Sequence, residues 1–246
     1  GGPARYFVES QEPKVCVRAL AAAQHDGVAV LPIGGGSNLL VADGGFDGLV
    51  MKYAASGYEV VDRGDGTGVV VAAAGALVGN MARRLARQGW GGLEWCATVP
   101  GTIGGAAVNN AGAFGGTMAN DLLDVEVVSP TGERRTVANA ELTYYYRTSA
   151  LKRGELGQVL VTSVRCGVRR VDPGEAQRRI AEQQASRSST QPRQLSAGSI
   201  FANPPGDHAG RLIEAAGLKG ERYGCAEISG HHANIIVNTV EAMATD

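Results

Sequence analysis

The residues whose types and spacing most clearly predict chemistry lie between Leu93 and Gly116, in the stretch LEWCATVPGTIGGAAVNNAGAFGG. This stretch is rich in glycine and carries almost no charge. Its polar side chains include the hydroxyls of Thr98 and Thr102 and the amides of Asn109 and Asn110. Glycine is used where the backbone turns through positive φ or approaches another group too closely for a Cβ atom. The composition therefore predicts a backbone that wraps closely around a flat ligand with polar edges.

A second glycine-rich segment, PIGGGSNLLV at residues 32–41, follows a predicted strand. Three consecutive glycines there can turn successive N–H groups inward as a nest for phosphate oxygens, and Ser37 and Asn38 would add hydrogen bonds. The segment is neither a Walker loop, which needs a following lysine, nor a GxGxxG motif that opens a helix. Taken alone, it is more typical of a plain tight turn than of a phosphate site. Together, the two segments favour one ligand that has both a diphosphate and a flat ring.

Hydrophobic periodicity and glycine punctuation predict the elements that must position these segments. We predict helices over residues 12–27, 77–88, 174–186 and 209–216. We predict strands over residues 28–33, 39–41, 49–52, 58–61, 69–74, 125–129, 133–137, 159–168, 226–228 and 234–238. Beyond Arg169 the chain becomes polar and rich in Arg, Gln and Ser, which places a domain boundary near residues 168–172.

The overall composition excludes several classes of protein. The 246 residues carry a formal net charge of −1, with 23 basic and 24 acidic residues and no basic block, which does not favour nucleic-acid binding. Hydrophobic residues make up 44% of the chain, yet no apolar run approaches the length that spans a membrane. The first residues, GGPARYFVES, lack the pattern of a signal peptide.

The cysteines and adjacent histidines give no sign of a metal site. Cys16, Cys96, Cys166 and Cys225 are widely spaced with no CxxC pair, so we expect free, mostly buried thiols in a reducing cytoplasm. If they lay in a strand, His231 and His232 would point to opposite faces, which disfavours joint ligation of a metal.

At this point the sequence resembles the UDP-N-acetylenolpyruvoylglucosamine reductase (MurB) family. The two glycine-rich segments are similar to the flavin-binding segments of that family. Further matching motifs follow in the family's order over nearly the whole chain, namely YYYRTS at 144–149, SAGSIFANP at 196–204, AGRLIEAAGLKG at 209–220 and EISGHHANIIVN at 227–238. The resemblance implies an α+β fold with a two-lobed FAD-binding region of the PCMH/VAO type over residues 1–168 (lobes about 1–53 and 54–168). A smaller α/β substrate-binding domain would follow over residues 169–246.

The resemblance also implies which residues bind FAD. The segment from Gly34 to Asn38 would hold the diphosphate, residues 96–103 would line the ribityl and isoalloxazine portions, and residues 109–115 would shape the rest. The implied cofactor-binding residues are Ile33, Gly34, Gly35, Gly36, Ser37, Asn38, Cys96, Ala97, Thr98, Val99, Pro100, Gly101, Thr102, Ile103, Asn109, Asn110, Ala111, Gly112 and Gly115. An uncharged wall of this kind would position the ring by contact while the cofactor supplies the redox chemistry.

Two residues correspond to catalytic groups of the family. Arg147, which taken alone is typical of a solvated strand residue, matches the arginine that binds near the substrate carboxylate. Ser199, which taken alone is typical of a turn, matches the serine that donates a proton to the intermediate. Motif matches imply substrate contacts for Tyr146, Asn203, Lys219 and Asn234. Ala202 stands where the family often has Lys or Arg, and we expect Arg211 to lie on a helix surface.

The resemblance implies reduction of an enolpyruvyl sugar nucleotide by NADPH through FAD, in the bacterial cytoplasm, with no nucleic-acid or membrane partner. The oligomeric state is not indicated by the sequence. Family members also have a short segment before Gly1 and continue beyond Asp246 to a strand that bears a catalytic glutamate, and Glu214, Glu227 and Glu241 do not match that position. The absence of a tyrosine-bearing insertion before Ser199 resembles the shorter subclass. Two alternatives remain, a flavin-dependent oxidase that tethers its flavin through Cys96 and a catalytically silent flavin or nucleotide binder.

Overall fold

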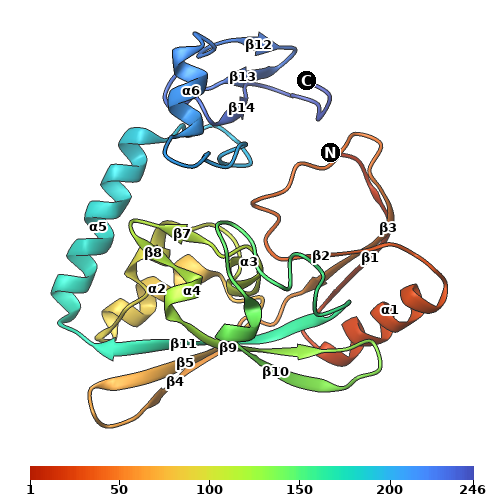
Figure 1. Ribbon diagram of the computed structural model, residues 1–246, viewed down its shortest axis with the longest axis vertical. Helices are drawn as coiled ribbons and strands as arrows, with labels where there is room; N and C mark the ends of the chain where they lie inside the picture. The colour runs from red at the N-terminus through yellow and green to blue at the C-terminus, as the bar shows by residue number, and fades with distance from the viewer. The chain divides into compact units, whose positions relative to one another are not determined.

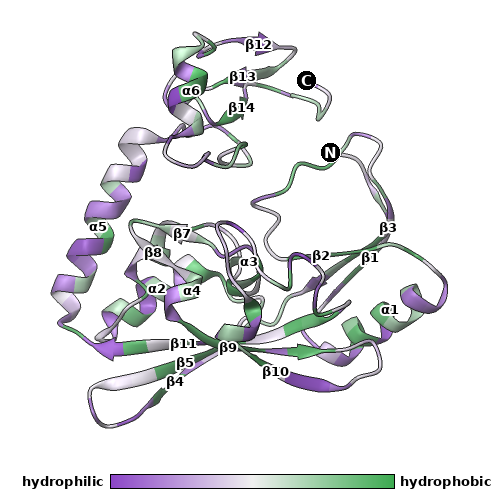
Figure 2. Ribbon diagram, in the orientation of Figure 1, coloured by the Kyte–Doolittle hydropathy of each residue, from purple (hydrophilic) through white to green (hydrophobic).

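The computed structural model describes residues 1–246, which form two compact units (Figure 1). The larger unit comprises residues 5–36 and 47–183, and the smaller unit comprises residues 1–4, 37–46 and 184–246. The division falls inside helix α5 (Pro173–Thr190), and residues 37–46 group with the C-terminal part of the chain. Helix α5 is mostly hydrophilic (Figure 2), but Ala176 and Ile180 in its first half are buried in the core of the larger unit. The functional assignment of the two units stays a prediction.

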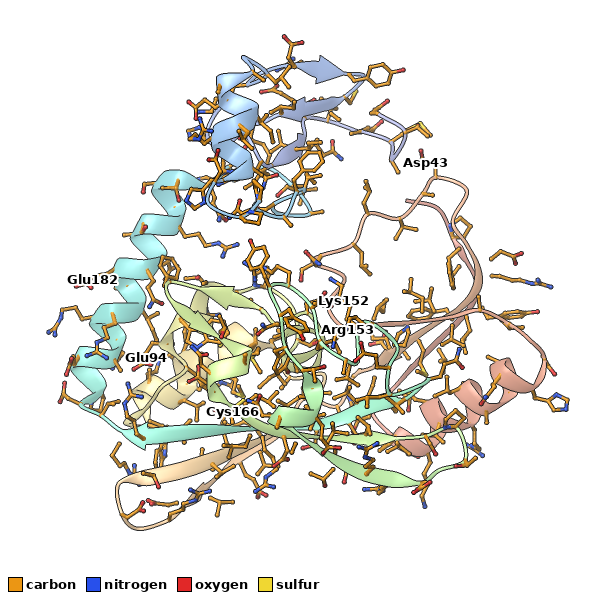
Figure 3. The ribbon with its side chains drawn as sticks, in the orientation of Figure 1. Asp43, Glu94, Lys152, Arg153, Cys166 and Glu182 are labelled. Carbon is orange, nitrogen blue, oxygen red and sulfur yellow. The ribbon has the colours of Figure 1, made fainter.

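An antiparallel sheet with the strand order β10-β9-β11-β5-β4 forms the centre of the larger unit, and β6 pairs with the end of β11. The strands are β4 (Tyr58–Asp62), β5 (Thr67–Ala73), β6 (Trp90–Gly91), β9 (Leu122–Val128), β10 (Arg134–Ala138) and β11 (Leu160–Arg170). Along β11, Val164, Cys166 and Val168 are buried at every second position. This is the period of a strand that has one face on a core, and Cys166 is marked on it in Figure 3.

Short elements cover this sheet and contain most of the glycine-rich stretch. They are α2 (Val78–Arg87), η1 (Glu94–Thr98), α3 (Ile103–Val108), β7 (Gly112–Ala113), β8 (Gly116–Thr117), α4 (Met118–Asp121) and η2 (Asn139–Leu142). Helix α2 lies against η1 with Gly79 at the contact, because a Cβ on Gly79 would lie 2.8 Å from the Ala97 carbonyl oxygen. The wall predicted to line a ligand is therefore packed directly on the core of the larger unit.

A second sheet, with the order β1-β3-β2, brings the chain to the glycine turn. Its elements are β1 (Ala4–Ser10), α1 (Pro13–His25), β2 (Val30–Ile33) and β3 (Phe46–Tyr53). Helix α1 buries Cys16, Val17 and Leu20 in a cluster that includes Met51 of β3. Strand β2 runs parallel to β3 and ends at Ile33, so Gly34 begins the turn directly after a paired strand.

The smaller unit contains the C-terminal part of the chain. Helix α6 (Ala209–Ala215) accompanies a sheet with the order β12-β13-β14, formed by β12 (Arg222–Tyr223), β13 (Ala226–Ile228) and β14 (Ile236–Asn238). Ala209, Ala233, Ile235 and Val237 are buried. Within this unit, the Asp43 carboxylate accepts hydrogen bonds from the backbone N–H groups of residues 244 and 245 at 2.8 and 3.0 Å.

The structure confirms all four predicted helices and, with shifted ends, most of the predicted strands. The strand predicted over residues 39–41 is wrong, because these residues pair with no strand and Leu40 is 74% exposed. His231 and His232 likewise lie outside any strand. No helix has both the length and the apolar character needed to cross a membrane.

Candidate cofactor cradle and substrate cleft

The glycine turn after β2 approaches the loop between η1 and α3 so closely that side chains cannot fit between them. A Cβ on Gly34 would lie 2.3 Å from Thr102 Oγ1, and a Cβ on Gly35 would lie 3.1 Å from the Gly101 Cα. Gly36 has a φ of 71°, and nothing lies within 4 Å of the place where its Cβ would be. Glycine is the residue that permits both the close approach and the positive φ. We call these two segments, residues 33–36 and 98–103, the cradle.

Backbone hydrogen bonds fix the second half of the cradle. Gly101 accepts one from the Val78 N–H at 3.1 Å, and the N–H groups of Ile103 and Gly104 donate to the carbonyls of Ala76 and Ala74 at 2.8 and 2.9 Å. The Thr102 hydroxyl accepts from the Gly105 N–H at 3.3 Å and so caps α3. Because these partners lie in residues 74–78, directly after β5 and at the start of α2, the loop is held at the end of that strand.

One hydroxyl of the cradle lacks a partner in the chain. Thr98 Oγ1 is buried and makes no hydrogen bond, whereas buried polar groups are normally paired. An orphaned hydroxyl beside closely apposed glycines, in a wall whose side chains are uncharged, fits a flat cofactor with polar edges such as FAD. Of the predicted cofactor residues, Ile33 to Gly36 and Cys96 to Ile103 therefore belong to one local structure, whereas Ser37 and Asn38 belong to the smaller unit.

Asn109 and Asn110, which follow α3, use their side chains within the protein. The Asn109 amide donates to the Gly105 carbonyl at 2.9 Å. Asn110, at a φ of 46°, donates to the Tyr145 carbonyl at 2.9 Å and accepts from the Ala119 N–H at 3.0 Å. Asn110 thus connects the glycine-rich stretch to the segment that carries Arg147. Ala111, Gly112 and Gly115 continue that stretch into the β7–β8 hairpin.

Arg147 lies at the tip of a tight turn. Tyr145 and Thr148 exchange backbone hydrogen bonds of 3.2 Å, which leaves Tyr146 and Arg147 as the two central residues. Arg147 has a φ of 60°, a conformation that favours glycine or asparagine and costs other residues about 1–3 kcal/mol. Its guanidinium donates to the Gly112 carbonyl at 3.1 Å and lies 5.5 Å from the centre of the Tyr146 ring, and it has no carboxylate partner. The exposed guanidinium can therefore bind a carboxylate by donating hydrogen bonds to it.

The flanks of this turn are hydrogen-bonded to α3. The Tyr144 hydroxyl donates to the Ala107 carbonyl at 3.0 Å, and the fully buried Ser149 hydroxyl donates to the Val108 carbonyl at 2.7 Å. Lys152 donates to the Arg147 carbonyl at 3.1 Å. Lys152 and Arg153 lie on the loop that follows (Figure 3). Burial raises the pKa of Tyr144, so its hydroxyl remains a hydrogen-bond donor.

Beside the cradle lies a group of buried or half-buried titratable residues, of which the sequence analysis named the two cysteines but not Asp121 and Glu94. Burial raises the pKa of Cys96 well above its ordinary value and that of Cys166 to about 12. Burial also raises the pKa of Asp121, whose carboxylate accepts from the Trp95 indole at 2.7 Å. Glu94 accepts from the Gly92 N–H at 2.7 Å, while its other oxygen is buried without a partner. Only tertiary packing reveals this group, because its members are dispersed in the sequence.

The smaller unit contains a cleft of about 330 Å³, and most of the residues that line it carry polar side chains. Its lining residues are Ser199, Asn203, His208, Gly210, Arg211, Glu214, Lys219, His231, His232, Ala233 and Asn234. Ser199 is exposed, follows Gly198 at a φ of 82°, and forms an isolated bridge with Ile235. The cleft therefore brings together Ser199 and three of the residues implied to bind substrate, although these are dispersed between positions 199 and 234.

Some polar side chains of the cleft already form hydrogen bonds or ion pairs within the protein. Asn203 Oδ1 accepts from the Ala209 N–H at 3.0 Å, at the start of α6. Lys219 forms an ion pair of 2.6 Å with Glu214. Arg211 lies on the exposed surface of α6, as predicted, and its ion pair with Asp207 lowers the pKa of that carboxyl. The imidazoles of His208 and His231 add polar groups that the sequence analysis did not use.

The fold and the cradle define the class of the protein. Residues 4–138 match the family model described as an FAD binding domain, and residues 191–246 match the model for the C-terminal domain of UDP-N-acetylenolpyruvoylglucosamine reductase. The chain is a flavoprotein with an α+β fold, in which an FAD-binding domain precedes a domain typical of that reductase. This confirms the fold class and the cofactor expected from the sequence.

Individual relatives agree with this class. Over its full length the chain is 44% identical to the UDP-N-acetylenolpyruvoylglucosamine reductase of Chloroflexus aggregans and 42% identical to that of Chloroflexus aurantiacus, and it covers 83% of each. The crystal structure of the corresponding reductase from Thermus caldophilus matches with a TM-score of 0.84 and 38% identity, covering 100% of this chain and 85% of that one. The chain belongs to the UDP-N-acetylenolpyruvoylglucosamine reductase family.

Proposed function

We propose that this protein uses NADPH to reduce the enolpyruvyl group of UDP-N-acetylenolpyruvoylglucosamine, giving UDP-N-acetylmuramate for peptidoglycan synthesis in a bacterial cytoplasm. One observation carries the proposal. The match to the FAD binding domain falls on the residues that form the cradle, and the match to the reductase C-terminal domain falls on the cleft that contains Ser199. A flavin oxidase or a silent nucleotide binder would not need both an FAD binding domain and the reductase C-terminal domain.

The cradle residues would hold FAD. The N–H groups of Gly34 to Gly36 would bind the diphosphate, and the uncharged wall from Cys96 to Ile103, with the unpartnered Thr98 hydroxyl, would bind the ring portion. When bound, FAD supplies the two-electron chemistry that takes a hydride from NADPH and passes it to the enolpyruvyl double bond. The residues of the protein would position the substrate, exclude water from the site and donate the proton to the intermediate.

Arg147 would bind the carboxylate of the enolpyruvyl group. Its guanidinium is exposed and pairs with no carboxylate of the chain, and the planar fork of an arginine matches a carboxylate in two hydrogen bonds. Negative charge that develops beside the carboxylate during reduction is stabilised by this fixed positive charge, and such electrostatic stabilisation is typically worth 10²–10³ in rate, about 3–4 kcal/mol. The contacts to Gly112 and to the Tyr146 ring would restrict the directions that the guanidinium can take.

Ser199 would donate the proton. Addition of a hydride to one carbon of the double bond leaves an electron pair on the other carbon, next to the carboxylate. The Ser199 O–H bond breaks, the proton forms the new C–H bond, and water then returns a proton to the serine oxygen. No hydrogen bond within the chain engages the Ser199 hydroxyl, which lines the cleft and can therefore point toward a ligand. Serine is a weak acid, so the step depends on the strong basicity of the carbanion.

The alternative of an oxidase with a flavin tethered through Cys96 is disfavoured by the environment of that thiol. A tether forms from a thiolate, and burial raises the pKa of Cys96 well above its ordinary value. The flavin should therefore be released intact when the protein is denatured with acid.

Steady-state kinetics tests the proposed function. NADPH oxidation by the flavin-loaded protein should require UDP-N-acetylenolpyruvoylglucosamine and should produce UDP-N-acetylmuramate in equal amount. UDP-N-acetylglucosamine, which lacks the enolpyruvyl group, is the matched control and should give no turnover. The proposed function would be wrong if NADPH were oxidised equally fast with both sugar nucleotides. It would also be wrong if oxygen, and not the sugar nucleotide, were the substance reduced by NADPH.

A further inference from the structure

The buried side chain of Asn234 holds the segment that carries Ser199. Its Oδ1 accepts a hydrogen bond from the Phe201 N–H at 2.9 Å, and its Nδ2 donates to the Phe201 carbonyl at 2.8 Å. Asn234 is one of the residues that line the cleft, but only 3% of its surface is exposed. Both ends of its carboxamide are therefore engaged with a single residue of the neighbouring segment, two positions beyond Ser199.

The main chain at Asn234 and Ile235 continues this connection. The Asn234 carbonyl accepts from the Ile200 N–H at 3.0 Å, and Ser199 bridges to Ile235. On the other side of Ser199, Gly198 has a φ of 82°, its N–H donates a 3.4 Å hydrogen bond to the Ser196 hydroxyl, and the Leu195 carbonyl accepts from the Asn238 N–H at 2.9 Å. Asn234 is therefore the residue that holds the two positions directly after Ser199 through both its side chain and its carbonyl.

We propose that Asn234 is a positioning residue that fixes the direction in which Ser199 presents its hydroxyl. This inference rests on the proposed function, and it replaces the substrate contact that the motif alone implies for Asn234. The carboxamide of Asn234 uses one N–H and one oxygen lone pair on Phe201, and because the residue is only 3% exposed, its second N–H and second lone pair offer little surface to a substrate.

The side chain at this position must accept and donate at a fixed distance from the backbone. Aspartate has the same shape as asparagine but cannot donate when ionised, so it would keep the bond to the Phe201 N–H and place an oxygen against the Phe201 carbonyl. Alanine would remove both bonds. A misplacement of about 1 Å at a reacting group can cost about 100-fold in rate, so the Ser199 step should be sensitive to either change.

The test compares Asn234→Asp and Asn234→Ala with Asn238→Ala in the flavin-loaded protein. Asn238 is the matched control, because its side chain also accepts one backbone hydrogen bond, from the Ala242 N–H at 3.0 Å, but makes no contact with residues 198–201. We expect kcat for the sugar nucleotide to fall about 10- to 100-fold in both Asn234 variants. KM and the rate of flavin reduction by NADPH should change little, and Asn238→Ala should resemble the wild type.

Amide hydrogen exchange gives a second readout that does not depend on activity. The Phe201 amide should exchange faster in Asn234→Ala than in the wild type, and its exchange should be unchanged in Asn238→Ala. A rise in KM at constant kcat would instead make Asn234 a substrate ligand and overturn the proposal, as would an equal fall in both half-reactions or an unchanged Phe201 amide. If the wild type reduces no sugar nucleotide, the proposed function fails, while exchange at Phe201 still decides whether Asn234 holds the segment.

Discussion

The turn that carries Arg147 and the segment that carries Ser199 are held in different ways. Hydrogen bonds from Tyr144, Ser149 and Asn110 join the Arg147 turn to the glycine-rich stretch on both flanks. The Ser199 segment is held mainly by Asn234 and by main-chain contacts at its C-terminal side. The difference is consistent with the two proposed roles, since a residue that binds a charge needs a fixed platform, whereas a proton donor needs one well-defined direction of its hydroxyl.

The largest effect is expected from Arg147→Gln, which removes the positive charge and keeps a side chain of similar length. Turnover of the sugar nucleotide should fall about 10²–10³-fold, as it does when a group that stabilises charge in the transition state is lost. The matched control is Arg153→Gln, because Arg153 lies on the same loop but its guanidinium is paired with Glu155 at 2.6 Å (Figure 3). Steady-state kinetics of both variants checks this prediction, and equal losses in the two would mean that Arg147 acts only through the stability of the loop.

The next effect concerns α3, which anchors the Arg147 turn. A Cβ on Gly104 would lie 2.9 Å from the Ala74 carbonyl oxygen, so Gly104→Ala must shift the backbone and should destabilise the protein by about 1–3 kcal/mol. A Cβ on the adjacent Gly105 would contact only Thr102 Oγ1, at 3.4 Å, so Gly105→Ala should be neutral or stabilise the helix by up to about 1 kcal/mol. Urea unfolding gives both free energies. Similar values for the two variants would contradict the close contact between α3 and β5.

The smallest effect is expected beside the Ser199 cleft, at Asp207. The hydrogen bond from Arg211, and next the His208 N–H, lower the pKa of Asp207, so the folded state favours the ionised carboxylate. This contribution to stability is present above the ordinary aspartate pKa of about 3.9 and is lost as the pH falls toward the lowered pKa of the folded state. Asp207→Asn should therefore be slightly less stable than the wild type at neutral pH, and the difference should shrink in acid. Unfolding midpoints across this pH range check the sign, and a difference that grows in acid would contradict it.

Local sequence patterns predicted most of the framework of both regions. The glycines at 34–36 and the stretch from 93 to 116 are local signals, since each reflects the backbone conformation of its own segment. The predicted helices around α2 and α6 also follow from periodicity within a single element. In contrast, the predicted strand over residues 39–41 is absent, because a strand depends on a partner elsewhere in the chain, and local β propensity does not provide one.

The details that matter most for the site depend on contacts distant in sequence. Arg147 at positive φ could not be predicted, because a turn with arginine at that position is costly and exists only where the flanking hydrogen bonds to α3 maintain it. The amides of Asn110 and Asn234 matched family motifs as cofactor and substrate contacts. Those contacts stay predictions. Each side chain also makes two hydrogen bonds to distant parts of the protein, and these partners cannot be recognised from spacing alone.

The most direct test of the account is a measurement of the two half-reactions in Ser199→Ala by stopped-flow spectroscopy. Reduction of the flavin by NADPH should proceed at the wild-type rate, because Ser199 takes no part in it. Reoxidation of the reduced flavin by the enolpyruvyl sugar nucleotide should slow at least about 10²-fold, which is the lower range for loss of a general acid. Equal slowing of both half-reactions, or reoxidation at the wild-type rate, would contradict the assignment of Ser199 as the proton donor.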